Sequence, residues 1–366
     1  MLSGVAACWL ASAALAGEQS QAARPAQDAR ERVARISADL FSATPHLTDD
    51  VRELKEILAA DTSNAQAHML LGIAYRGLGS QEMTSEAIAE LRQAIALDPG
   101  FVPSRLYLAY IYLDIGRAQR AREELDAALQ QSPGNPQLLA LSGEAERQLK
   151  NTQRALELAQ QSLKIDPSSA EARYYLGLAL FDSGKRAEAM KELEQVVASG
   201  QAAPDAYLSL GTLYVEAGRF DDAVKTLARG TAIDSSRADL HIQLARAYRS
   251  AGLLDKAAEQ LRLARPKPGM PLAPSEFRQQ QLEFDLALEQ GALDFQRGRP
   301  TAAIAALKKA LSMDPANGPA NRYLAQIYLR EGSYATAAQY ALRAEQAGVP
   351  LSAEERKRLQ EGLRRK

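Results

Sequence analysis

The chain has 366 residues, of which 46% are hydrophobic, and its 44 lysine and arginine side chains nearly balance its 45 aspartates and glutamates. The net charge of −1 shows no basic excess of the kind typical of nucleic-acid-binding proteins, so we expect no nucleic-acid partner. With one cysteine, Cys8, and three histidines, the chain is short of ligands for a zinc or haem site. We therefore expect neither a metal nor a cofactor.

Residues 5–16 form a short apolar run that ends in Ala14-Leu15-Ala16, a small-residue pattern typical of a cleavage site. The run is too short to span a bilayer, and no positive side chain precedes it. We interpret residues 1–16 as a signal-like leader that is removed after Ala16. This interpretation predicts an exported protein of the periplasm or cell envelope.

Two alternatives remain for the same segment. Residues 5–8, Val-Ala-Ala-Cys, resemble a bacterial lipoprotein box, which would acylate Cys8 and attach the protein to a membrane. In the second alternative, the apolar run is merely the end of a helix, and the protein is cytoplasmic. We adopt the cleaved leader, because the apolar run and the small-residue site occur together.

Residues 17–64 connect the leader to the rest of the chain. Residues 18–27 are polar and rich in glutamine and alanine, as in a flexible tether. Helices are expected at about 28–41 and 48–60, and the second has an apolar face that includes Leu54 and Ile57. We interpret this pair of helices as an N-terminal cap on a repeat array.

From residue 65 onwards, three series of small residues recur in phase. Alanine recurs in steps of 34 residues, with one step of 46, at Ala87, Ala121, Ala155, Ala189, Ala223, Ala257, Ala303 and Ala337. Glycine or alanine precedes each of these by 12 residues, or by 15 in the first case, at Gly72, Ala109, Gly143, Gly177, Gly211, Ala245, Gly291 and Ala325. Glycines that can end a helix stand at Gly116, Gly184, Gly218, Gly252, Gly298 and Gly332.

Residues 204–235 show what one period contains. Tyr207, Leu210 and Tyr214 are three and four residues apart, the spacing of one helix face, and Gly218 ends that helix. A second helix follows, and the small residues of the first two series let the two helices approach closely. Such a hairpin cannot bury both of its apolar faces alone, so it needs neighbours of the same kind.

This pattern resembles the tetratricopeptide repeat, a helix–turn–helix unit of about 34 residues. Its Leu-Gly-x-x-Tyr motif and closing proline are met at Leu71, Gly72, Tyr75, Leu210, Gly211, Tyr214, Pro99, Pro133, Pro167 and Pro315. The resemblance covers about eight repeats, from Ala65 to Val349. It implies an all-α fold, an α-solenoid of about eight helical hairpins in a right-handed superhelix with capping helices at both ends. The early tryptophan of the family is replaced in every repeat, and His68 and His241 at this position are interpreted as packing residues rather than ligands.

Four prolines in residues 266–275 interrupt the array, because no helix continues through such a segment. Residues 65–265 then hold six repeats, and residues 276–366 hold two repeats and a C-terminal capping helix. Ser352 and Glu355 form the capping-box pattern that begins this last helix. We expect the proline-rich segment to be a hinge or kink, with fewer contacts across it than between regular repeats.

In the tetratricopeptide repeat family, a few positions of each first helix line a concave groove. Carried over by repeat position, the candidate partner-binding residues are Tyr110, Arg147, Tyr174, Leu178, Phe181, Arg246, Arg249 and Arg322. Aromatic and arginine side chains are enriched at interface hot spots, and arginines pair with partner carboxylates. We expect Arg246 to be exposed and to contribute little to folding. The alternative is that Tyr174 and Phe181 complete the core between adjacent first helices.

No residue spacing singles out a catalytic pair, and no glycine-rich phosphate loop is present, so we expect no enzyme activity. The resemblance implies a non-catalytic scaffold that binds an extended peptide or helix of a partner protein. Together with the leader, the resemblance implies that the protein assists the assembly of a cell-envelope, secretion, polysaccharide-export or pilus system. The alternative is a cytoplasmic adaptor or co-chaperone, although the asparagine positions of chaperone-binding relatives hold other residues here, such as Ile73 and Tyr110.

Overall fold

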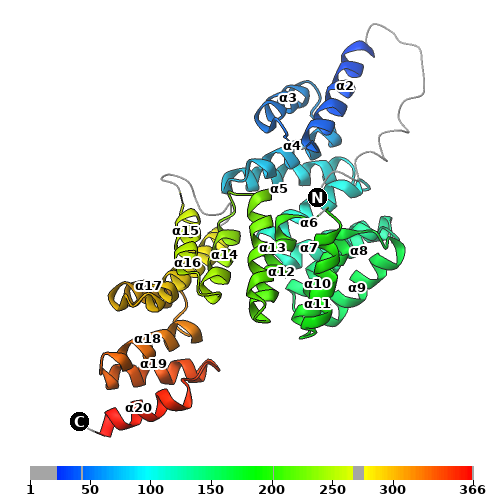
Figure 1. The fold of residues 1–366 in the computed structure, drawn as a ribbon. Coiled ribbons are helices and arrows are strands. Elements are labelled where there is room, and N and C mark those ends of the chain that lie inside the picture. Colours follow the sequence, from blue (N-terminus) through cyan, green and yellow to red (C-terminus); the bar gives the residue numbers. More distant parts are fainter. Residues whose placement is uncertain (1–22, 43, 201, 267–275, 365–366) are drawn as a thin grey trace. The chain divides into compact units, whose positions relative to one another are not determined.

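A computed structural model describes residues 23–42, 44–200, 202–266 and 276–364 (Figure 1). The predicted leader, Cys8 and most of the proline-rich segment lie outside these ranges. The chain forms two compact units, unit 1 up to residue 203 and unit 2 from residue 204. Every regular element in the described ranges is an α-helix, which confirms the all-α prediction.

Eight helical hairpins occupy residues 65–346, so the predicted α-solenoid of helical hairpins is confirmed. Unit 1 contains the pairs α4 (Ala65–Leu78) and α5 (Gln81–Leu97), α6 (Val102–Asp114) and α7 (Ala118–Gln131), α8 (Pro136–Gln148) and α9 (Thr152–Ile165), and α10 (Ala170–Asp182) and α11 (Arg186–Ala198). Unit 2 contains the pairs α12 (Pro204–Glu216) and α13 (Phe220–Ile233), α14 (Ala238–Ser250) and α15 (Leu254–Leu263), α16 (Glu276–Gln296) and α17 (Pro300–Met313), and α18 (Gly318–Arg330) and α19 (Tyr334–Gln346).

Capping helices flank the hairpins. At the N-terminal end, α2 (Ala23–Leu40) and α3 (Leu47–Ala60) bury Ile36 and Leu54 in a core shared with α4. At the other end, α20 (Ala353–Arg364) packs Leu359 with α19. The predicted capping box is formed, because Ser352 N donates to Glu355 Oε2 at 2.8 Å and Glu355 N donates to Ser352 Oγ at 3.2 Å.

Within a hairpin, the small residue of the first helix lies against the second helix. A Cβ atom added at Gly211 would lie under 3.0 Å from three atoms of Leu227, which is fully buried. The same arrangement recurs for three further pairs, Gly72 with Leu91, Gly177 with Leu193, and Gly291 with Leu307. The recurring alanine of the second helix is buried in all eight hairpins. Both series of small residues therefore mark the closest approach of the two helices, as expected.

The turn inside a hairpin requires a left-handed residue. Gly218 has φ +73°, and the other five glycines of the predicted series also have positive φ. In the two hairpins outside that series, the left-handed residues are Gly79, with φ +74°, and Lys150, with φ +67°. Lys150 shows that the turn geometry persists where the glycine is absent.

In four hairpins, the side chain at the position of the missing tryptophan bonds both to the second helix and to the turn before the hairpin. Arg173 donates from Nη1 to Glu192 Oε2 and from Nη2 to the carbonyl oxygen of Pro167, both at 2.9 Å. Equivalent pairs of contacts link Arg105 to Glu124 and Pro99, His68 to Glu90 and Thr62, and His241 to Gln260 and Ser235. The two histidines are thus engaged in packing contacts, in agreement with their interpretation from the sequence.

Each unit has two layers of helices. In unit 1, the consecutive first helices α4, α6, α8 and α10 contact one another, and in unit 2 so do α12, α14, α16 and α18. The main contacts of a second helix are with its own first helix and with the next one. The first helices are therefore the more closely spaced layer of each unit, and we call their outward surface the first-helix face.

Helices on both sides of the proline-rich segment share a core within unit 2. Leu293 of α16 packs with Ala245, Ala257 and Leu261 of α14 and α15, and all four side chains are fully buried. Residues 267–275 themselves lie outside the described ranges. The hinge stays a prediction, and this shared core argues against a break in the stack there.

We expect Gly211→Val to lower the free energy of unfolding by about 1–3 kcal/mol, because the new side chain overpacks Leu227. Combining it with Leu227→Ala should recover part of this loss, since the third hairpin naturally pairs Gly143 with Ala159. Thermal and denaturant unfolding of the single and double variants measures the coupling. Gly134→Ala is the control, because nothing lies within 4 Å of its added Cβ. Simple additivity would contradict the close-approach explanation.

Candidate functional site

All eight predicted site residues lie on first helices, but they divide between the two units. Unit 1 holds Tyr110 on α6, Arg147 on α8, and Tyr174, Leu178 and Phe181 on α10. Unit 2 holds Arg246 and Arg249 on α14 and Arg322 on α18. The structure therefore assembles two separate sets, each of which has its own surroundings.

In unit 1, α10 presents three half-buried apolar side chains, Tyr174, Leu178 and Phe181, which we call the α10 strip. Their spacing of four and three residues puts them on one face of the helix. The Arg186 guanidinium lies 5.6 Å from the centre of the Phe181 ring, and the Tyr174 ring lies 5.5 Å from that of Tyr175. These three residues, which were predicted from the sequence, therefore share one surface of α10.

Tyr110 instead takes part in a polar network inside the chain. Its hydroxyl group donates to Glu171 Oε1 at 2.6 Å and accepts from Gln137 Nε2 at 3.2 Å. The first of these bonds joins α6 to α10, two hairpins further on. Burial and the Glu171 carboxylate raise the pKa of Tyr110 well above its ordinary value. Tyr110 therefore links first helices through hydrogen bonds of its hydroxyl group.

Arg147 joins α8 to α10. Its guanidinium donates to both oxygens of Glu144, at 2.7 and 2.8 Å, and to Asp182 Oδ2 at 2.8 Å. Only 8% of the Glu144 side chain is exposed. Burial opposes the charge of Arg147, but the two carboxylates outweigh it and raise the pKa of the guanidinium. Arg147 therefore contributes to the structure, whatever it binds.

In unit 2, one buried carboxylate holds two of the predicted arginines. Arg246 Nε donates to Glu289 Oε1 at 2.6 Å, and Arg249 Nε donates to Glu289 Oε2 at 3.0 Å. Glu289 is on α16, and 4% of its side chain is exposed, against 25% for Arg246 and 12% for Arg249. Arg249 also reaches the Tyr323 hydroxyl group at 3.5 Å.

This arrangement corrects the expectation that Arg246 is exposed and contributes little to folding. Its charge and that of Arg249 together compensate the buried carboxylate of Glu289. Asp285 lies close by, and the pKa of its carboxyl group is raised, mainly by burial. The charge of Glu289 adds to this rise, whereas the charge of Arg246 opposes it. The three arginines Arg147, Arg246 and Arg249 are thus ion-paired within the chain rather than free.

Arg322 differs from these three. It is half-buried, and its Nε atom is enclosed without a hydrogen-bond partner. Its neighbour on the same helix face, Gln326, donates to Glu355 Oε1 at 2.8 Å. Burial opposes the charge of Glu355, but hydrogen bonds from Ser352 and Gln326, with a smaller effect of the Arg322 charge, lower the pKa of Glu355. Arg322 is therefore the predicted arginine whose polar groups are least engaged by the chain.

The sequence interpretation missed the carboxylates that hold these residues. Glu289 is the clearest case, because it stands within the apolar stretch Leu286–Leu293 and is buried. A charged residue at a buried helix position requires a partner, so the pattern carried a signal. Naming the partner required knowledge of which helix packs on which.

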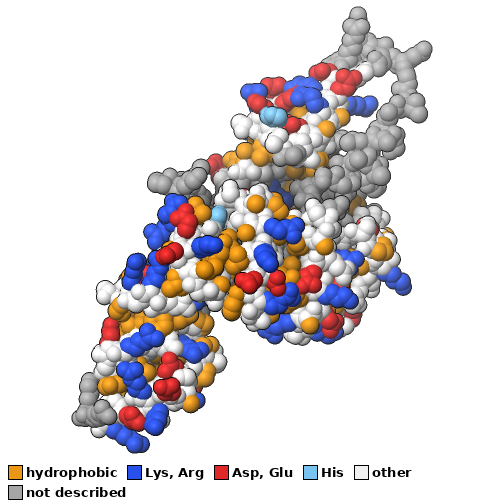
Figure 2. All heavy atoms as spheres, viewed as in Figure 1, with side chains coloured by type: hydrophobic (Ala, Val, Ile, Leu, Met, Phe, Trp, Pro, Cys, Tyr) orange, Lys and Arg blue, Asp and Glu red, His pale blue; other side chains and the backbone are white. Residues whose placement is uncertain are grey.

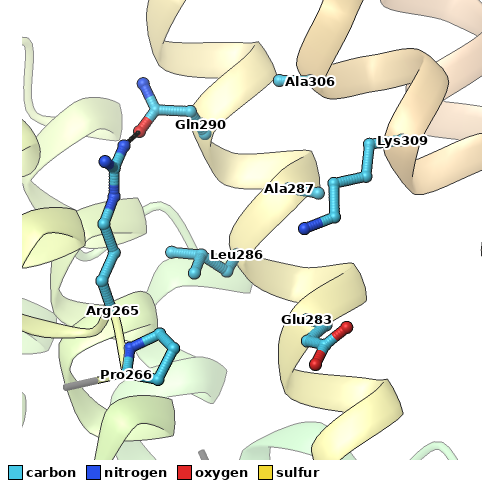
Figure 3. A pocket seen from close by; sticks show the side chains of 8 residues that line it. All are labelled: Arg265, Pro266, Glu283, Leu286, Ala287, Gln290, Ala306 and Lys309. Carbon is cyan, nitrogen blue, oxygen red and sulfur yellow. Dashed lines mark hydrogen bonds between the residues drawn. The ribbon is translucent and has the colours of Figure 1, made fainter. Parts of the chain in front are cut away.

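A pocket of about 520 Å³ lies elsewhere in unit 2 (Figure 3). It is formed by the end of α15, by α16 and by α17, and its lining residues are Arg265, Pro266, Glu283, Leu286, Ala287, Gln290, Ala306 and Lys309. Arg265 Nη2 donates to Gln290 Oε1 at 3.2 Å. None of the eight predicted site residues lines this pocket.

Other kinds of site find no support in the described part of the chain. It contains no group of three or more His, Cys, Asp or Glu residues placed to hold a metal ion. None of its helices combines the length and the apolar character needed to cross a membrane. On the visible face, charged side chains of both signs are interspersed over both units (Figure 2).

Family models described as tetratricopeptide repeat match most of the chain. One model matches residues 80–145, 146–211, 180–241 and 214–269, and a second matches residues 288–350. A search of curated protein sequences finds no match.

One solved structure shows the same fold over most of the chain. One chain of the APC/C hetero-tetramer Cut9–Hcn1 is similar with a TM-score of 0.70 and 14% identity, over 91% of this chain and 62% of that chain. This chain thus spans less than two thirds of that relative. A tetratricopeptide repeat protein from Parabacteroides merdae ATCC 43184 has a TM-score of 0.49 and 16% identity, over 72% of this chain and 98% of its own. A thermophilic TPR protein from Thermus thermophilus has a TM-score of 0.46 and 22% identity, over 50% of this chain and 99% of its own.

We expect Arg246→Glu to destabilise unit 2 by an amount on the order of 3 kcal/mol, because it adds a carboxylate beside buried Glu289 and Asp285. Arg246→Lys, which keeps the charge, should cost less. Thermal unfolding followed by circular dichroism measures both. Arg262→Glu is the control, since its ion pair with Glu259 is exposed and should leave the melting temperature unchanged. An unchanged melting temperature for Arg246→Glu would restore the exposed-arginine view.

Proposed function

Because the chain belongs to the tetratricopeptide repeat family, we propose that it is a non-catalytic scaffold that holds segments of partner proteins against its first helices. Proteins with this fold bind protein partners. Each unit has one contact surface: the α10 strip in unit 1, and the exposed part of the Arg246 guanidinium in unit 2.

The α10 strip is the observation that carries the proposal. Its three side chains are half-buried, so packing holds them in place while part of each stays accessible. The polar groups beside the strip already have partners within the chain, as in Tyr110 with Glu171 and Arg147 with Glu144. A fixed apolar strip beside satisfied polar groups is typical of the energetic centre of a protein interface.

In unit 2, the support comes from the way in which Glu289 holds Arg246. The hydrogen bond uses Nε, and a quarter of the arginine side chain is exposed. The guanidinium is therefore fixed in direction before any partner arrives, which lowers the entropic cost of binding. A carboxylate of a partner segment would accept charge-assisted hydrogen bonds from the terminal nitrogens.

We further propose that the protein is exported and serves the assembly of a cell-envelope, secretion, polysaccharide-export or pilus system. The support is the apolar run and Ala-x-Ala pattern of residues 5–16, together with family analogy. The support for a binding role does not depend on this location. A cytoplasmic adaptor or co-chaperone would use the same first-helix face.

A photo-crosslinking amino acid placed at Phe181 should form a discrete adduct with a partner protein in the organism that encodes the chain. The same amino acid at Ile165 is the control, because Ile165 is also apolar and is 52% exposed, but lies at the end of a second helix. Leu178→Ala should strongly reduce the adduct at position 181 at a temperature at which the variant is still folded, with only a modest fall in melting temperature because Leu178 is half-buried. Equal adducts at both positions would place binding outside the α10 strip.

The location is tested by N-terminal sequencing of protein from fractionated cells. We expect the mature chain to begin at Gly17 and to be found outside the cytosol, because cleavage follows Ala16. An acylated Cys8 in the membrane fraction would instead support the lipoprotein alternative. An intact Met1 in the cytosol would contradict export by either route.

A further inference from the structure

The pocket in unit 2 occurs where the seventh hairpin departs from the others. Ala287 holds the position at which three other repeats carry a polar residue that bonds to the second helix 19 residues later. Those pairs are Arg105 with Glu124, Arg173 with Glu192, and His241 with Gln260. In the seventh hairpin the corresponding pair is Ala287 and Ala306, and both line the pocket. Two large side chains are thus missing from the place where the pocket opens.

A shortened helix widens the same place. α15 has 10 residues, whereas α13 and α17 have 14 each. The last turn of an ordinary second helix is therefore absent where α15 ends beside α16. The remaining volume of about 520 Å³ accommodates a large side chain, and it lies within the range of ligand pockets in proteins.

The walls of the pocket combine an apolar floor with cations at its rim. Leu286, Ala287 and Ala306 form the floor, while Arg265 and Lys309 lie on opposite sides of it (Figure 3). Gln290 holds Arg265 in place through its hydrogen bond. Lys309 is exposed and makes no ion pair with the described residues. The one acidic group of the lining, Glu283, accepts a hydrogen bond from Gln279 Nε2 at 3.1 Å.

We infer that this pocket binds an acidic segment of a partner protein, which inserts an apolar side chain between Ala287 and Ala306 and places flanking carboxylates at Arg265 and Lys309. The apolar side chain replaces the volume that the two alanines leave open, and its burial supplies affinity. The carboxylates match the charge of the rim and set the direction of the segment. The pocket contains none of the eight predicted partner-binding residues, and it does not depend on the function proposed for them.

Three short peptides test this inference on the full chain. Acetyl-Glu-Phe-Glu-amide combines both features, acetyl-Gln-Phe-Gln-amide lacks the charges, and acetyl-Glu-Ala-Glu-amide lacks the large side chain. Binding is followed by NMR through the methyl resonances of Ala287 and Ala306. We expect the first peptide to shift both resonances and to bind at least about tenfold more tightly than the other two.

Variants of the pocket give a second measurement. Ala306→Leu should abolish binding because it fills the pocket, and Lys309→Glu should weaken binding about tenfold because it reverses one rim charge. Lys308→Glu is the matched control, since Lys308 is an exposed neighbour that does not line the pocket. Only variants whose melting temperature equals that of the unmodified protein are compared. If Ala306→Leu does not fold, Lys309→Glu provides the test.

Three results would overturn the inference. The first is the absence of any shift at Ala287 and Ala306 with the acidic phenylalanine peptide. The second is equal binding of the glutamine peptide, which would remove the role of the rim charges. The third is equal weakening by Lys308→Glu and Lys309→Glu, which would show that net charge rather than the pocket is responsible.

Discussion

The close approach of two helices at a small residue is the contact on which the rest of the structure depends. In each hairpin, glycine or alanine on the first helix leaves room for the buried side chains of the second, as Gly211 does for Leu227. A hairpin closed in this way presents one apolar side to its neighbours, which bury it in turn. The stack, its spacing and its end caps follow from repeating that contact. Since the contact uses residues inside the hairpin, the exposed faces remain free to vary.

Polar ties between first helices form a second level of organisation. The bonds of Tyr110 to Glu171 and of Arg249 to Tyr323 each reach past one hairpin to the next but one. Arg147 and Arg246 each compensate a buried carboxylate on the same layer. Tyr110, Arg147, Arg246 and Arg249, which the sequence predicts to face a partner, are thus residues that hold neighbouring repeats together. A loss of binding on substitution would be assigned to contact with a partner only in variants with a stability control.

The sequence predicts the features that recur within one repeat. It does not predict the contacts between side chains of different repeats. Hairpins, positive-φ glycines, small contact residues and the Ser352–Glu355 capping box all depend on local spacing, and the structure contains them. The partner of Arg246 is 43 residues away, across the one irregular step of the array, so no fixed offset indicates it. Lys150 in the place of a turn glycine illustrates the converse, because the packed neighbours impose the turn on a residue that disfavours it. The α10 strip was predictable since it lies on a single helix.

Repetition also indicates where a second function has room to arise. At a regular position, a side chain must fit both its own hairpin and the next, so most substitutions disturb two interfaces. In the seventh hairpin this requirement is relaxed only beside the end of α15, which is short and is followed by additional residues before α16. Ala287 and Ala306 replace a polar pair there without loss of the helices that carry them. Of the lining residues, Arg265, Ala306 and Lys309 lie outside the first helices, whereas Leu286 of α16 packs against the sixth hairpin. An array of this kind thus combines a regular face, shaped by stability, with an irregular pocket that is open to selection for a different partner.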